Sequence, residues 1–399
     1  MKGSVNTLCH CVLQAILNCC NMTICVIIIN MANTLGNKVD MAAQEIAALY
    51  LEHVDSTLPF GTGHINDTYL VNSRDEKFIL QRLNPSVFRR PDYVMENIAR
   101  VTGHIKRKLI ATGGDPQRET LTLLPARDGR ICIMDEGGGV WRLYPYIENT
   151  CAYENSVSPS AVESAAECFG RFALLLDDFP TEKLHTTLPG FHNTVERVET
   201  LERAARQDVC DRFESVRSVY DSFMDRTHIA REFCRVCGDI APRATHNDTK
   251  LSNVLFDKET DKAVCVIDLD TVMQGCIISD YGDGIRSCAA ASSEDSGTAV
   301  LDAGLFSAFS RGYIRALGGV LTQAELSSLL LGAFAMIYEN GVRFLTDYLM
   351  GDIYFKVNNP KHNLTRALNQ LGLLCDAEAK QDELKLVLHG IIFSSCGMR

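Results

Sequence analysis

The feature that most constrains the fold is a strand-rich segment that lies inside a part of the chain with helical patterning. Residues 245–257 (THNDTKLSNVLFD) and 263–272 (AVCVIDLDTV) join short apolar runs to polar loops. The segments before and after them, from about 156 to 237 and from 295 to 389, have the spacing of amphipathic helices. This order predicts a mainly helical domain that carries a small, polar strand-and-loop insertion.

A second strand-rich region comes before these helices. The runs 60–73 (FGTGHINDTYLVNS) and 77–84 (KFILQRLN) flank a turn, and three short runs follow between 121 and 149. Four apolar residues between 94 and 105 repeat at helical spacing. Residues 61 to about 148 therefore predict a small antiparallel sheet with one inserted helix.

The N-terminal stretch differs from the rest of the chain. Residues 3–37 contain no Asp, Glu, Lys or Arg, but Asn and Gln interrupt the apolar run, so it has no clean span of about 20 apolar residues. The stretch is either a weak signal anchor or the upstream part of a gene model whose translation starts at Met31 or Met41. We favour the second interpretation and expect no membrane partner. The expected parts of the chain are an extension (1–40), a β-rich N-lobe (41–150) and a larger helical C-lobe (151–399).

The composition limits the partners. The 399 residues include 39 Lys and Arg against 50 Asp and Glu, a net charge of −11, so the chain is a poor ligand for nucleic acids. Phosphate binding is expected to use backbone amides and a divalent cation instead. Five of the 16 Cys lie in the first 25 residues and the others are scattered, which favours the reducing cytoplasm over a disulfide framework. Cys234 and Cys237 are interpreted as two thiols on a helix, with a zinc or redox site as the alternative.

The strand-and-loop insertion carries polar residues at the spacing of a phosphoryl-transfer site. His246, Asp248 and Asn253 form an H-x-D-x4-N pattern, in which the Asp accepts or orients the substrate hydroxyl and the Asn binds Mg²⁺. By itself this pattern also fits a simple polar turn. Asp268 and Asp270 follow an apolar strand, where a second Mg²⁺ ligand is expected. The two motifs in this order predict a Mg²⁺-dependent phosphotransferase site.

The segments HNDTKLSNVLFD, VIDLDTVMQG and SDYGDGIRS resemble the catalytic and metal segments of the aminoglycoside/choline kinase-like phosphotransferases, and in particular those of the bacterial N-acetylhexosamine 1-kinases. GTGHINDTYLV, FILQRLN, WRLYPYIENT and GVRFLTDYLMGDIYF extend the resemblance over residues from about 42 to 370. It implies an α+β, two-lobe protein-kinase-like fold. It also implies Asp248 as the catalytic base in contact with the substrate, and Asn253 and Asp268 as Mg²⁺ ligands. Asp270 remains open between a structural role and a second metal.

The resemblance also implies where the nucleotide binds. Two Gly in the loop Gly61–Asn66 more often mark a bend, but the resemblance makes this loop the cover of the nucleotide, with His64 close to the transferred phosphate or the acceptor. Relatives usually carry a Lys on the next strand, where this chain has Gln81. Without that Lys, Glu96 is expected to be a solvated helix charge. The implied nucleotide-binding residues are Gly61, Gly63, Asn66, Gln81 and the hinge residues Tyr146 and Ile147.

Two C-lobe segments carry further candidates. Arg343 and Tyr354 suit directed contacts to sugar oxygens, and the resemblance implies that they bind the acceptor. The spacing alone favours a surface pair of Arg343 with Asp347 and a core Tyr. Asp280 and Asp283 are expected to cap a helix, with metal contact as the alternative.

The expected protein is an ATP- and Mg²⁺-dependent kinase that phosphorylates the anomeric hydroxyl of an N-acetylhexosamine (GlcNAc or GalNAc) to give the sugar 1-phosphate. One alternative is a kinase for another small alcohol, such as an amino alcohol, an aminoglycoside or homoserine. The other is a catalytically silent nucleotide-binding relative. The expected partners are the sugar and ATP, and the expected state is a monomer or a weak homo-oligomer.

Overall fold

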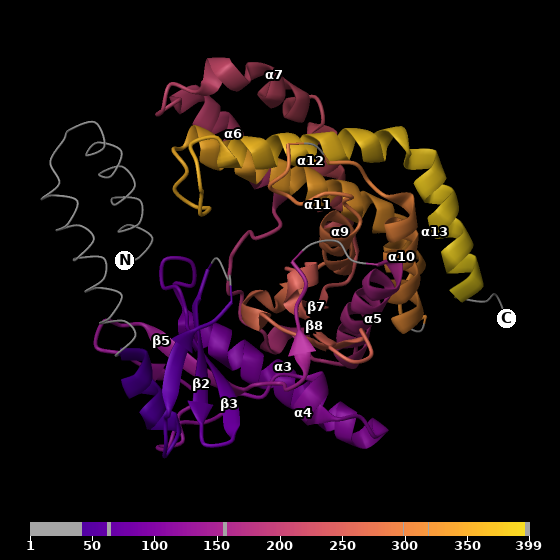
Figure 1. Cartoon of the computed structure of the whole chain (residues 1–399). Helices are drawn as coiled ribbons and strands as arrows, with labels where there is room; N and C mark the ends of the chain where they lie inside the picture. Colours follow the sequence, from indigo (N-terminus) through magenta and orange to yellow (C-terminus); the bar gives the residue numbers. More distant parts are fainter. Residues whose placement is uncertain (1–41, 62–64, 155–157, 298, 318, 396–399) are drawn as a thin grey trace, which may run out of the picture. The chain divides into compact units, whose positions relative to one another are not determined.

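The computed structural model describes residues 42–61, 65–154, 158–297, 299–317 and 319–395 (Figure 1). It divides into two compact units. The first contains the described residues up to Val87 together with Leu123–Tyr146, and the second contains Phe88–Thr122 and the chain from Ile147 onward. The predicted N-terminal extension lies outside the described residues. Within the described ranges, no helix is both long and apolar enough to cross a membrane.

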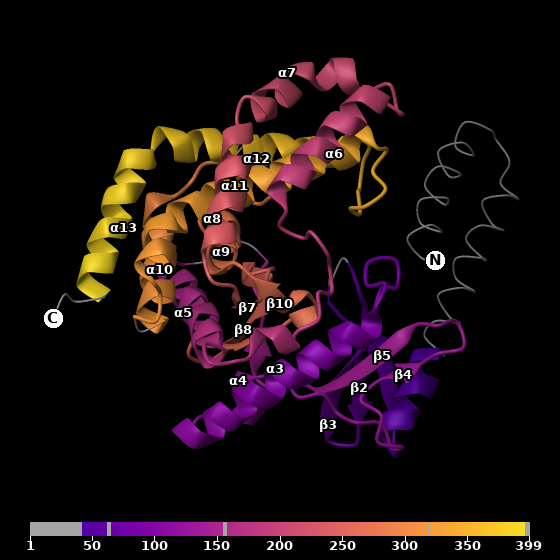
Figure 2. The same cartoon turned by 180° about the vertical axis from the view of Figure 1, so that it is seen from behind.

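The first unit is built on a five-stranded antiparallel sheet, as the sequence predicts (Figures 1 and 2). Its strands, in spatial order, are β1 (Ser56–Pro59), β2 (Asp67–Ser73), β3 (Glu76–Arg82), β5 (Val140–Pro145) and β4 (Ile133–Met134). Residues 42–50 form a helix. Because side chains alternate along a strand, one face of the sheet is apolar and packs with this helix, and the other is partly polar.

The core of the first unit lies between the helix 42–50 and the apolar face of the sheet. Trp141 is 1% exposed, and its carbonyl oxygen accepts a hydrogen bond of 2.8 Å from the Tyr50 hydroxyl. Its indole Nε1 donates to Asp135 at 2.8 Å, so the polar atom of the ring is satisfied. Trp141 is therefore a buried core residue whose polar atoms are all bonded. The other main core residues are Ala43, Ile46, Ala47, Tyr69, Val71, Phe78, Leu80 and Leu143.

The second unit is mainly helical. Its α-helices are α3 (Pro91–Thr112), α4 (Pro116–Glu119), α5 (Pro159–Leu175), α6 (Thr194–Gln207), α7 (Phe213–Met224), α8 (Thr227–Asp239), α9 (Ile277–Cys288), α10 (Ala303–Ala316), α11 (Gln323–Leu349), α12 (His362–Ala379) and α13 (Gln381–Ser395). Helix α11 is buried along nearly its whole length, and it begins with a capping box between Thr322 and Glu325. Cys234 and Cys237 both lie on α8.

Helices α9 and α11 approach each other very closely, and glycines make this approach possible. A Cβ atom on Gly282 would lie 2.1 Å from the carbonyl oxygen of Gly332. A Cβ atom on Gly332 would lie 2.1 Å from the carbonyl oxygen of Ile278. A larger residue at either position would therefore push the two backbones apart. This packing brings the acidic residues of α9 next to the buried helix α11.

The strand-and-loop insertion predicted from the sequence is present in the second unit. Strands β7 (Arg243–Thr245) and β10 (Met273–Gly275) pair with each other. β8 (Val254–Asp257) pairs with both β9 (Ala263–Val266) and β6 (Thr150–Cys151). Three short 3₁₀ turns complete the unit: η1 (Thr181–Lys183), η2 (Leu251–Asn253) and η3 (Leu269–Thr271). The loops 246–253 and 267–272 carry the predicted catalytic and metal-binding residues, and each starts where one of these short strands ends.

Candidate active site

His246 is a buried brace that ties the loop 246–253 to the loop 267–272. Its Nε2 donates to the carbonyl oxygen of Ile267 at 3.0 Å, and its Nδ1 accepts from the backbone N–H of Asp248 at 3.2 Å. These two partners require the neutral imidazole with the proton on Nε2. The Ile267 N–H also donates to the carbonyl oxygen of Asn253 at 2.9 Å. Ile267 therefore fixes the position of Asp268, the next residue, relative to both ends of the first loop.

Asp280 holds the backbone of the same loop from α9. Its two carboxylate oxygens accept the N–H groups of His246 and Asn247, each at 2.7 Å. Asn247 has a φ of 65°, a left-handed conformation that Asn tolerates better than most residues. Asp280 lies within the first turn of α9, whose N-cap residue is Cys276. The predicted capping role of Asp280 was therefore wrong, because the carboxylate bonds a distant loop and not its own helix.

Asp248 projects from this braced loop and is partly exposed. Asn253 Nδ2 donates to both the carbonyl and the Oδ2 of Asp248 at 2.9 Å, and Lys250 Nζ lies 2.9 Å from Oδ2. Burial alone would raise the pKa of Asp248, but Lys250 and Asn253 together lower it to about 2. The carboxylate is therefore ionised at neutral pH.

Asp268 lies close to this group at the end of β9. It has a φ of 60° and is partly exposed. It acts together with Asp248 to raise the pKa of Lys250, against the opposing effect of burial. Asp270 is 2% exposed within η3. Of the two carboxylates, Asp268 is thus the more accessible one.

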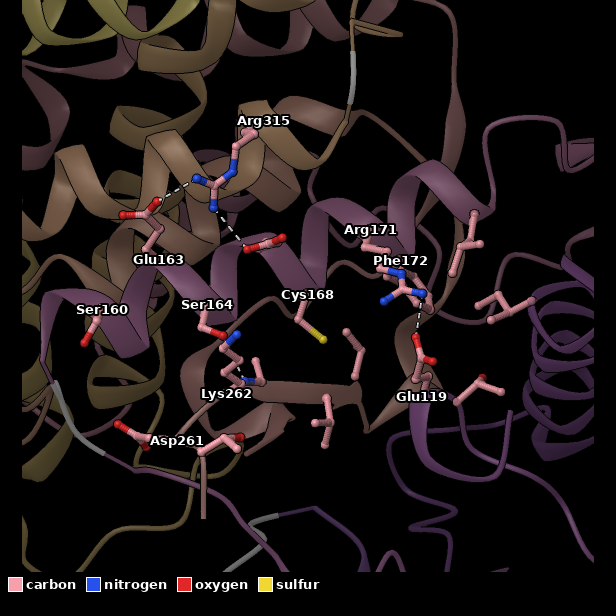
Figure 3. Close-up of a pocket in the computed structure, with 18 residues that line it drawn as sticks. Glu119, Ser160, Glu163, Ser164, Cys168, Arg171, Phe172, Asp261, Lys262 and Arg315 are labelled. Carbon is pink, nitrogen blue, oxygen red and sulfur yellow. Dashed lines mark hydrogen bonds and ion pairs between the residues drawn. The ribbon is translucent and has the colours of Figure 1, made fainter. Parts of the chain in front are cut away.

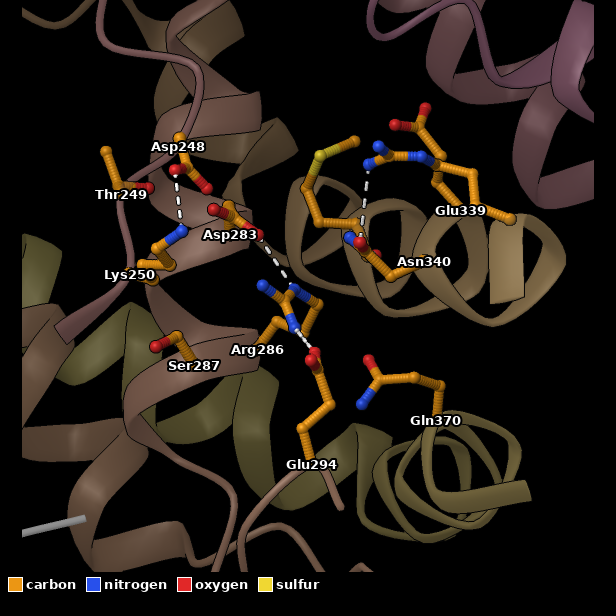
Figure 4. A network of polar contacts seen from close by, with 12 residues as sticks. Asp248, Thr249, Lys250, Asp283, Arg286, Ser287, Glu294, Glu339, Asn340 and Gln370 are labelled. Carbon is orange, nitrogen blue, oxygen red and sulfur yellow. Dashed lines mark hydrogen bonds and ion pairs between the residues drawn. The ribbon is translucent and has the colours of Figure 1, made fainter. Parts of the chain in front are cut away.

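Asp283, the second acidic residue of α9, belongs to an ion-pair network beside Asp248 (Figure 4). Arg286 Nε donates to Asp283 Oδ1 at 2.7 Å, and a second nitrogen of the same guanidinium pairs with Glu294. Asp283 also helps to raise the pKa of Lys250, after Asp248 and Asp268. Asp283 lies in the second turn of α9 and pairs with Arg286, so the capping prediction was wrong for this residue as well.

Arg343 lies within a ring of aromatic side chains. Its guanidinium carbon lies 5.5 Å from the ring centroids of Phe191 and Phe355 and 5.8 Å from that of Tyr354. Its Nη1 donates to Asn340 at 3.4 Å. Positions at this distance from aromatic faces are typical of cation–π contacts. Arg343 is therefore a positioned cation, held by rings and one amide oxygen.

The alternative pair of Arg343 with Asp347 was wrong. Asp347 is 4% exposed and accepts the backbone N–H groups of Ile353, Tyr354 and Phe355 at 2.8–3.0 Å. It anchors the loop that follows α11, which carries Tyr354. Tyr354 is 54% exposed, so it is not a core residue.

A buried His–Glu pair connects this region to the loop 246–253. His192 Nδ1 lies 2.9 Å from Glu339, and its Nε2 lies 3.2 Å from the carbonyl oxygen of Asn247. Thr194 Oγ1 donates to the same carboxylate at 2.6 Å. Burial alone would raise the pKa of Glu339, but His192, with help from Arg343, holds it below the ordinary value. Burial alone would lower the pKa of His192, but the charge of Glu339 raises it above the ordinary value. No local pattern in the sequence identifies these two residues, which lie 147 positions apart.

Arg197 of α6 adds a second guanidinium near Arg343. Its Nη2 donates to the carbonyl oxygen of Phe191 at 2.9 Å, and its buried Nε has no hydrogen-bond partner among the described residues. Burial, followed by the charge of Arg343, lowers the pKa of Arg197. A buried N–H without an acceptor is a group that a bound molecule can satisfy.

The nucleotide-binding candidates lie mainly in the first unit. Gly61 has a φ of 75°. The Asn66 side-chain oxygen accepts the backbone N–H of Asn84 at 3.1 Å. The Tyr146 backbone N–H donates to the carbonyl oxygen of Lys77 at 2.9 Å. Gly63 and His64 lie outside the described residues. Gln81 donates to Thr68 at 3.2 Å and accepts from Arg142. Ile147 is the residue at which the chain enters the second unit again, and its carbonyl oxygen accepts the Thr150 hydroxyl at 2.6 Å.

Glu96 on α3 has a side chain that is 46% exposed, and it pairs with Arg100 at 2.7 Å and His185 at 2.8 Å. It is therefore a surface charge on its helix, as the sequence predicts.

A family model described as the phosphotransferase enzyme family (APH) matches residues 56–320. The chain belongs to this family. The fold is also similar to three solved phosphotransferase structures. The first is a microcompartment-associated aminopropanol kinase, with 14% identity over 87% of this chain and 99% of that chain and a TM-score of 0.53. The second is an aminoglycoside phosphotransferase from Alicyclobacillus acidocaldarius, with 11% identity over 88% of this chain and 96% of that chain and a TM-score of 0.55. The third is the AMP-bound spectinomycin phosphotransferase APH(9)-Ia, with 10% identity over 85% of this chain and 98% of that chain and a TM-score of 0.52. The predicted protein-kinase-like α+β fold is confirmed by this likeness.

The second unit of the phosphotransferase also contains a cavity of about 510 Å³ (Figure 3). Carboxylates neutralise two of its arginines: Arg171 pairs with Glu119 at 2.6 Å, and Arg315 pairs with Glu167 at 3.1 Å. None of the predicted site residues lines it. We therefore do not include this cavity in the candidate active site.

Proposed function

We propose that this phosphotransferase uses ATP and Mg²⁺ to phosphorylate the anomeric hydroxyl of an N-acetylhexosamine, giving the sugar 1-phosphate. The family assignment supports phosphoryl transfer, and the AMP complex of a structurally similar phosphotransferase supports nucleotide binding. The loop Gly61–Asn66, Gln81 and the hinge residues Tyr146 and Ile147 would bind the nucleotide. His64, Arg343 and Tyr354 would bind the sugar.

Asp248 would orient the acceptor hydroxyl. A carboxylate with a pKa of about 2 is a weak base, so its main contribution is a hydrogen bond that fixes the attacking oxygen. Phosphoryl transfer proceeds through a loose transition state that needs little proton removal before bond formation. Positioning by the braced loop is therefore a sufficient role for Asp248, and the proton passes to it late.

Asn253 and Asp268 suit Mg²⁺. The Asn253 amide nitrogen donates to Asp248, which leaves its amide oxygen for a cation. No three His, Cys, Asp or Glu side chains gather into a metal cage in the described part of the chain. Mg²⁺ does not need such a cage, because it usually takes one or two carboxylate or amide ligands and completes its shell with phosphates and water. Bound there, it would neutralise charge on the phosphates.

The observation that carries the choice of acceptor is the guanidinium of Arg343 among three aromatic rings. Such rings would form a cage for a quaternary or primary ammonium, but here the protein's own cation occupies the place. Among the described residues, neither Arg343 nor Arg197 has a carboxylate at ion-pair distance. The nearby carboxylates of Asp283 and Glu339 are already paired with Arg286 and His192.

This charge distribution disfavours cationic acceptors such as amino alcohols and aminoglycosides. It favours a neutral acceptor with oxygen atoms that can accept from guanidinium groups, such as the acyl carbonyl and hydroxyls of an N-acetylhexosamine.

A matched pair of acceptors tests the proposal. N-acetylglucosamine and glucosamine share the ring and its hydroxyls, but the acetamide of the first is replaced by an ammonium group in the second. We expect ATP- and Mg²⁺-dependent turnover of N-acetylglucosamine or N-acetylgalactosamine, with ³¹P coupling to the anomeric proton in NMR of the product. Faster turnover of glucosamine, aminopropanol or an aminoglycoside would overturn the acceptor assignment. ATP binding with no turnover across the panel would support the silent relative.

A further inference from the structure

The peptide group that joins Asn247 to Asp248 is held by two imidazole rings. On one side the Asp248 N–H donates to Nδ1 of His246 at 3.2 Å. On the other side the carbonyl oxygen of Asn247 lies 3.2 Å from Nε2 of His192. Because a peptide group is planar, the two contacts fix the orientation of its plane. The Cα atom of Asp248 belongs to this plane, so the same contacts fix the point from which the Asp248 side chain starts.

Asn247 needs this support because its backbone is left-handed, with a φ of 65°. A residue with a side chain keeps such a conformation only where several contacts determine it. Asp280 accepts the Asn247 N–H at 2.7 Å, and the Asn247 amide donates to the carbonyl oxygen of Thr271 at 2.9 Å. His192 holds the third group, the carbonyl oxygen. Each of these three contacts comes from a different segment of the second unit.

The contact with His192 requires a proton between His192 and Glu339. Nε2 must carry a proton to donate to a carbonyl oxygen, and Nδ1 lies 2.9 Å from the Glu339 carboxylate. Beside an ionised carboxylate, Nδ1 must carry a proton as well, so the ring is an imidazolium. Without the second proton, either the Nδ1 lone pair faces the carboxylate or Nε2 loses its bond to Asn247. The Glu339 side chain is 0% exposed, so water does not replace the lost partner.

The surroundings of the pair favour this proton. Burial alone would lower the pKa of His192, but Glu339, followed by Asp283, raises it against the effect of Arg343. The proton is therefore lost only as the pH rises through this raised pKa. The charged and titratable groups that face the pair come from four helices: Arg197 (α6), Cys237 (α8), Asp280 and Asp283 (α9) and Arg343 (α11).

The residue before His192 contacts the proposed acceptor site. The ring centroid of Phe191 lies 5.5 Å from the guanidinium carbon of Arg343, and the Phe191 carbonyl oxygen accepts from Arg197 at 2.9 Å. Two successive residues, Phe191 and His192, thus connect the two guanidinium groups to the peptide group before Asp248.

We infer that His192 is a positioning residue for phosphoryl transfer, which with Glu339 holds the peptide group before Asp248 so that this carboxylate meets the acceptor hydroxyl. The inference rests on the role proposed for Asp248. A displacement of about 1 Å in a reacting group lowers kcat by about 100-fold. Since other residues are proposed to bind the nucleotide, a variant of His192 should change kcat and not KM for ATP.

His192→Phe keeps a ring at this position but removes both nitrogen atoms. With the N-acetylhexosamine that the wild type turns over fastest, we expect kcat to fall by roughly 10- to 100-fold and KM for ATP to stay within about twofold. His192→Gln, whose amide can still donate to Asn247, should keep more of kcat than His192→Phe. In hydrogen exchange followed by mass spectrometry, His192→Phe should take up deuterium faster than the wild type in the segment 246–253.

His104→Phe is the matched control. The His104 side chain is 15% exposed, against 14% for His192, and its Nε2 also lies 2.9 Å from a carboxylate, that of Asp178. This pair ties α3 to the segment after α5 and does not involve the loop 246–253. The control should leave kcat within about twofold of the wild type and should not change deuterium uptake in the loop.

Glu339→Gln tests the proton. Its amide can accept from the Thr194 hydroxyl and donate to Nδ1, so a neutral His192 can still donate from Nε2 to Asn247. Without the carboxylate, burial is the largest remaining effect, and it lowers the pKa of His192. We expect the wild-type kcat to fall as the pH rises through the raised pKa of His192, and this fall to be smaller in Glu339→Gln. Overlapping alkaline profiles of kcat would overturn the inference.

The outcomes separate the inference from the proposed function. If Asp248→Asn keeps the wild-type kcat, the role of Asp248 is refuted and the inference falls with it. If Asp248→Asn loses turnover while His192→Phe keeps it, only the role of His192 is refuted. A rise in KM for ATP as large as the fall in kcat would show a merely structural role and overturn the inference.

Hydrogen exchange does not depend on turnover. If the wild type turns over no acceptor, the proposed function is refuted, and faster uptake in His192→Phe still shows that His192 holds the loop. Equal uptake in the two chains refutes the contact itself. If His192→Phe does not fold in a thermal unfolding measurement, the same comparisons on His192→Gln and Glu339→Gln decide.

Discussion

Replacing Asp280 by Asn should damage catalysis from a residue that is not expected to touch any substrate. In the wild type each carboxylate oxygen accepts one backbone N–H of the loop, from His246 and from Asn247, at 2.7 Å. Asn has a single acceptor oxygen. Its NH₂ group would therefore face one of the two N–H donors across a buried contact.

The expected cost follows from these contacts. A hydrogen bond to a charged acceptor contributes about 1.5–3 kcal/mol, and a buried donor left without a partner costs about 1–3 kcal/mol. Burial raises the pKa of Asp280, so removing the charge returns part of its desolvation cost. We expect a net loss on the order of 3 kcal/mol in the free energy of unfolding. Because Asp248 follows the two released amides, its displacement by about 1 Å should lower kcat about 100-fold.

Urea unfolding and steady-state kinetics with the preferred acceptor would measure both effects. Asp302→Asn is the control, because Asp302 also accepts a backbone N–H, from Leu305 at 2.9 Å, but this bond caps α10 and does not involve the loop 246–253. It should lower the free energy of unfolding by about 1 kcal/mol or less and leave kcat unchanged. An Asp280→Asn variant with wild-type kcat would show that the loop does not depend on this brace.

Four further predictions concern the groups that meet substrate or metal. Asp248→Asn should keep ATP binding but lower kcat by about 10²- to 10⁴-fold, and an unchanged kcat would remove Asp248 from its role. Lys250→Met should shift the acid limb of the kcat/KM profile to higher pH, since Lys250 makes the largest contribution to the lowered pKa of Asp248; overlapping profiles would contradict this. A carboxylate whose pKa is lowered in the folded state stabilises the fold at pH values above its unfolded-state pKa, and for Asp248 this stabilisation is lost as the pH falls toward 2. Because Lys250→Met removes part of this stabilisation, the stability of the variant should depend less on pH in acid. Asp268→Ala should abolish the tightening of ATP binding by Mg²⁺ in calorimetry, and a persisting Mg²⁺ effect would favour Asp270 as the ligand. Arg343→Lys should raise KM for the acceptor by roughly 5- to 150-fold with KM for ATP within twofold, because Lys keeps the charge but loses the fork of donors; a KM for the acceptor within twofold of the wild type would exclude the contact.

The sequence by itself determined the elements that depend on neighbours in the chain. The short apolar runs of β2, β3 and β5 predicted a small antiparallel sheet with one inserted helix. The spacing of Asp248 and Asn253 placed an acid and an amide in one loop, and the structure joins them by a hydrogen bond of 2.9 Å. Asp268 was assigned because it ends a buried strand. In each case, the periodicity of a strand or the reach of a short loop is enough to predict the arrangement.

Only the tertiary structure decided which groups support and surround that loop. Asp280 was expected to cap its own helix, but the close packing of α9 with α11 directs it to His246 and Asn247. Arg343 and Asp347 are one helical turn apart, a spacing that favours an ion pair, yet Asp347 accepts three N–H groups of a later loop instead. A buried carboxylate gains more from several fixed backbone donors than from one flexible partner. Such choices depend on burial and on residues far away in the chain, and local spacing contains no information about either.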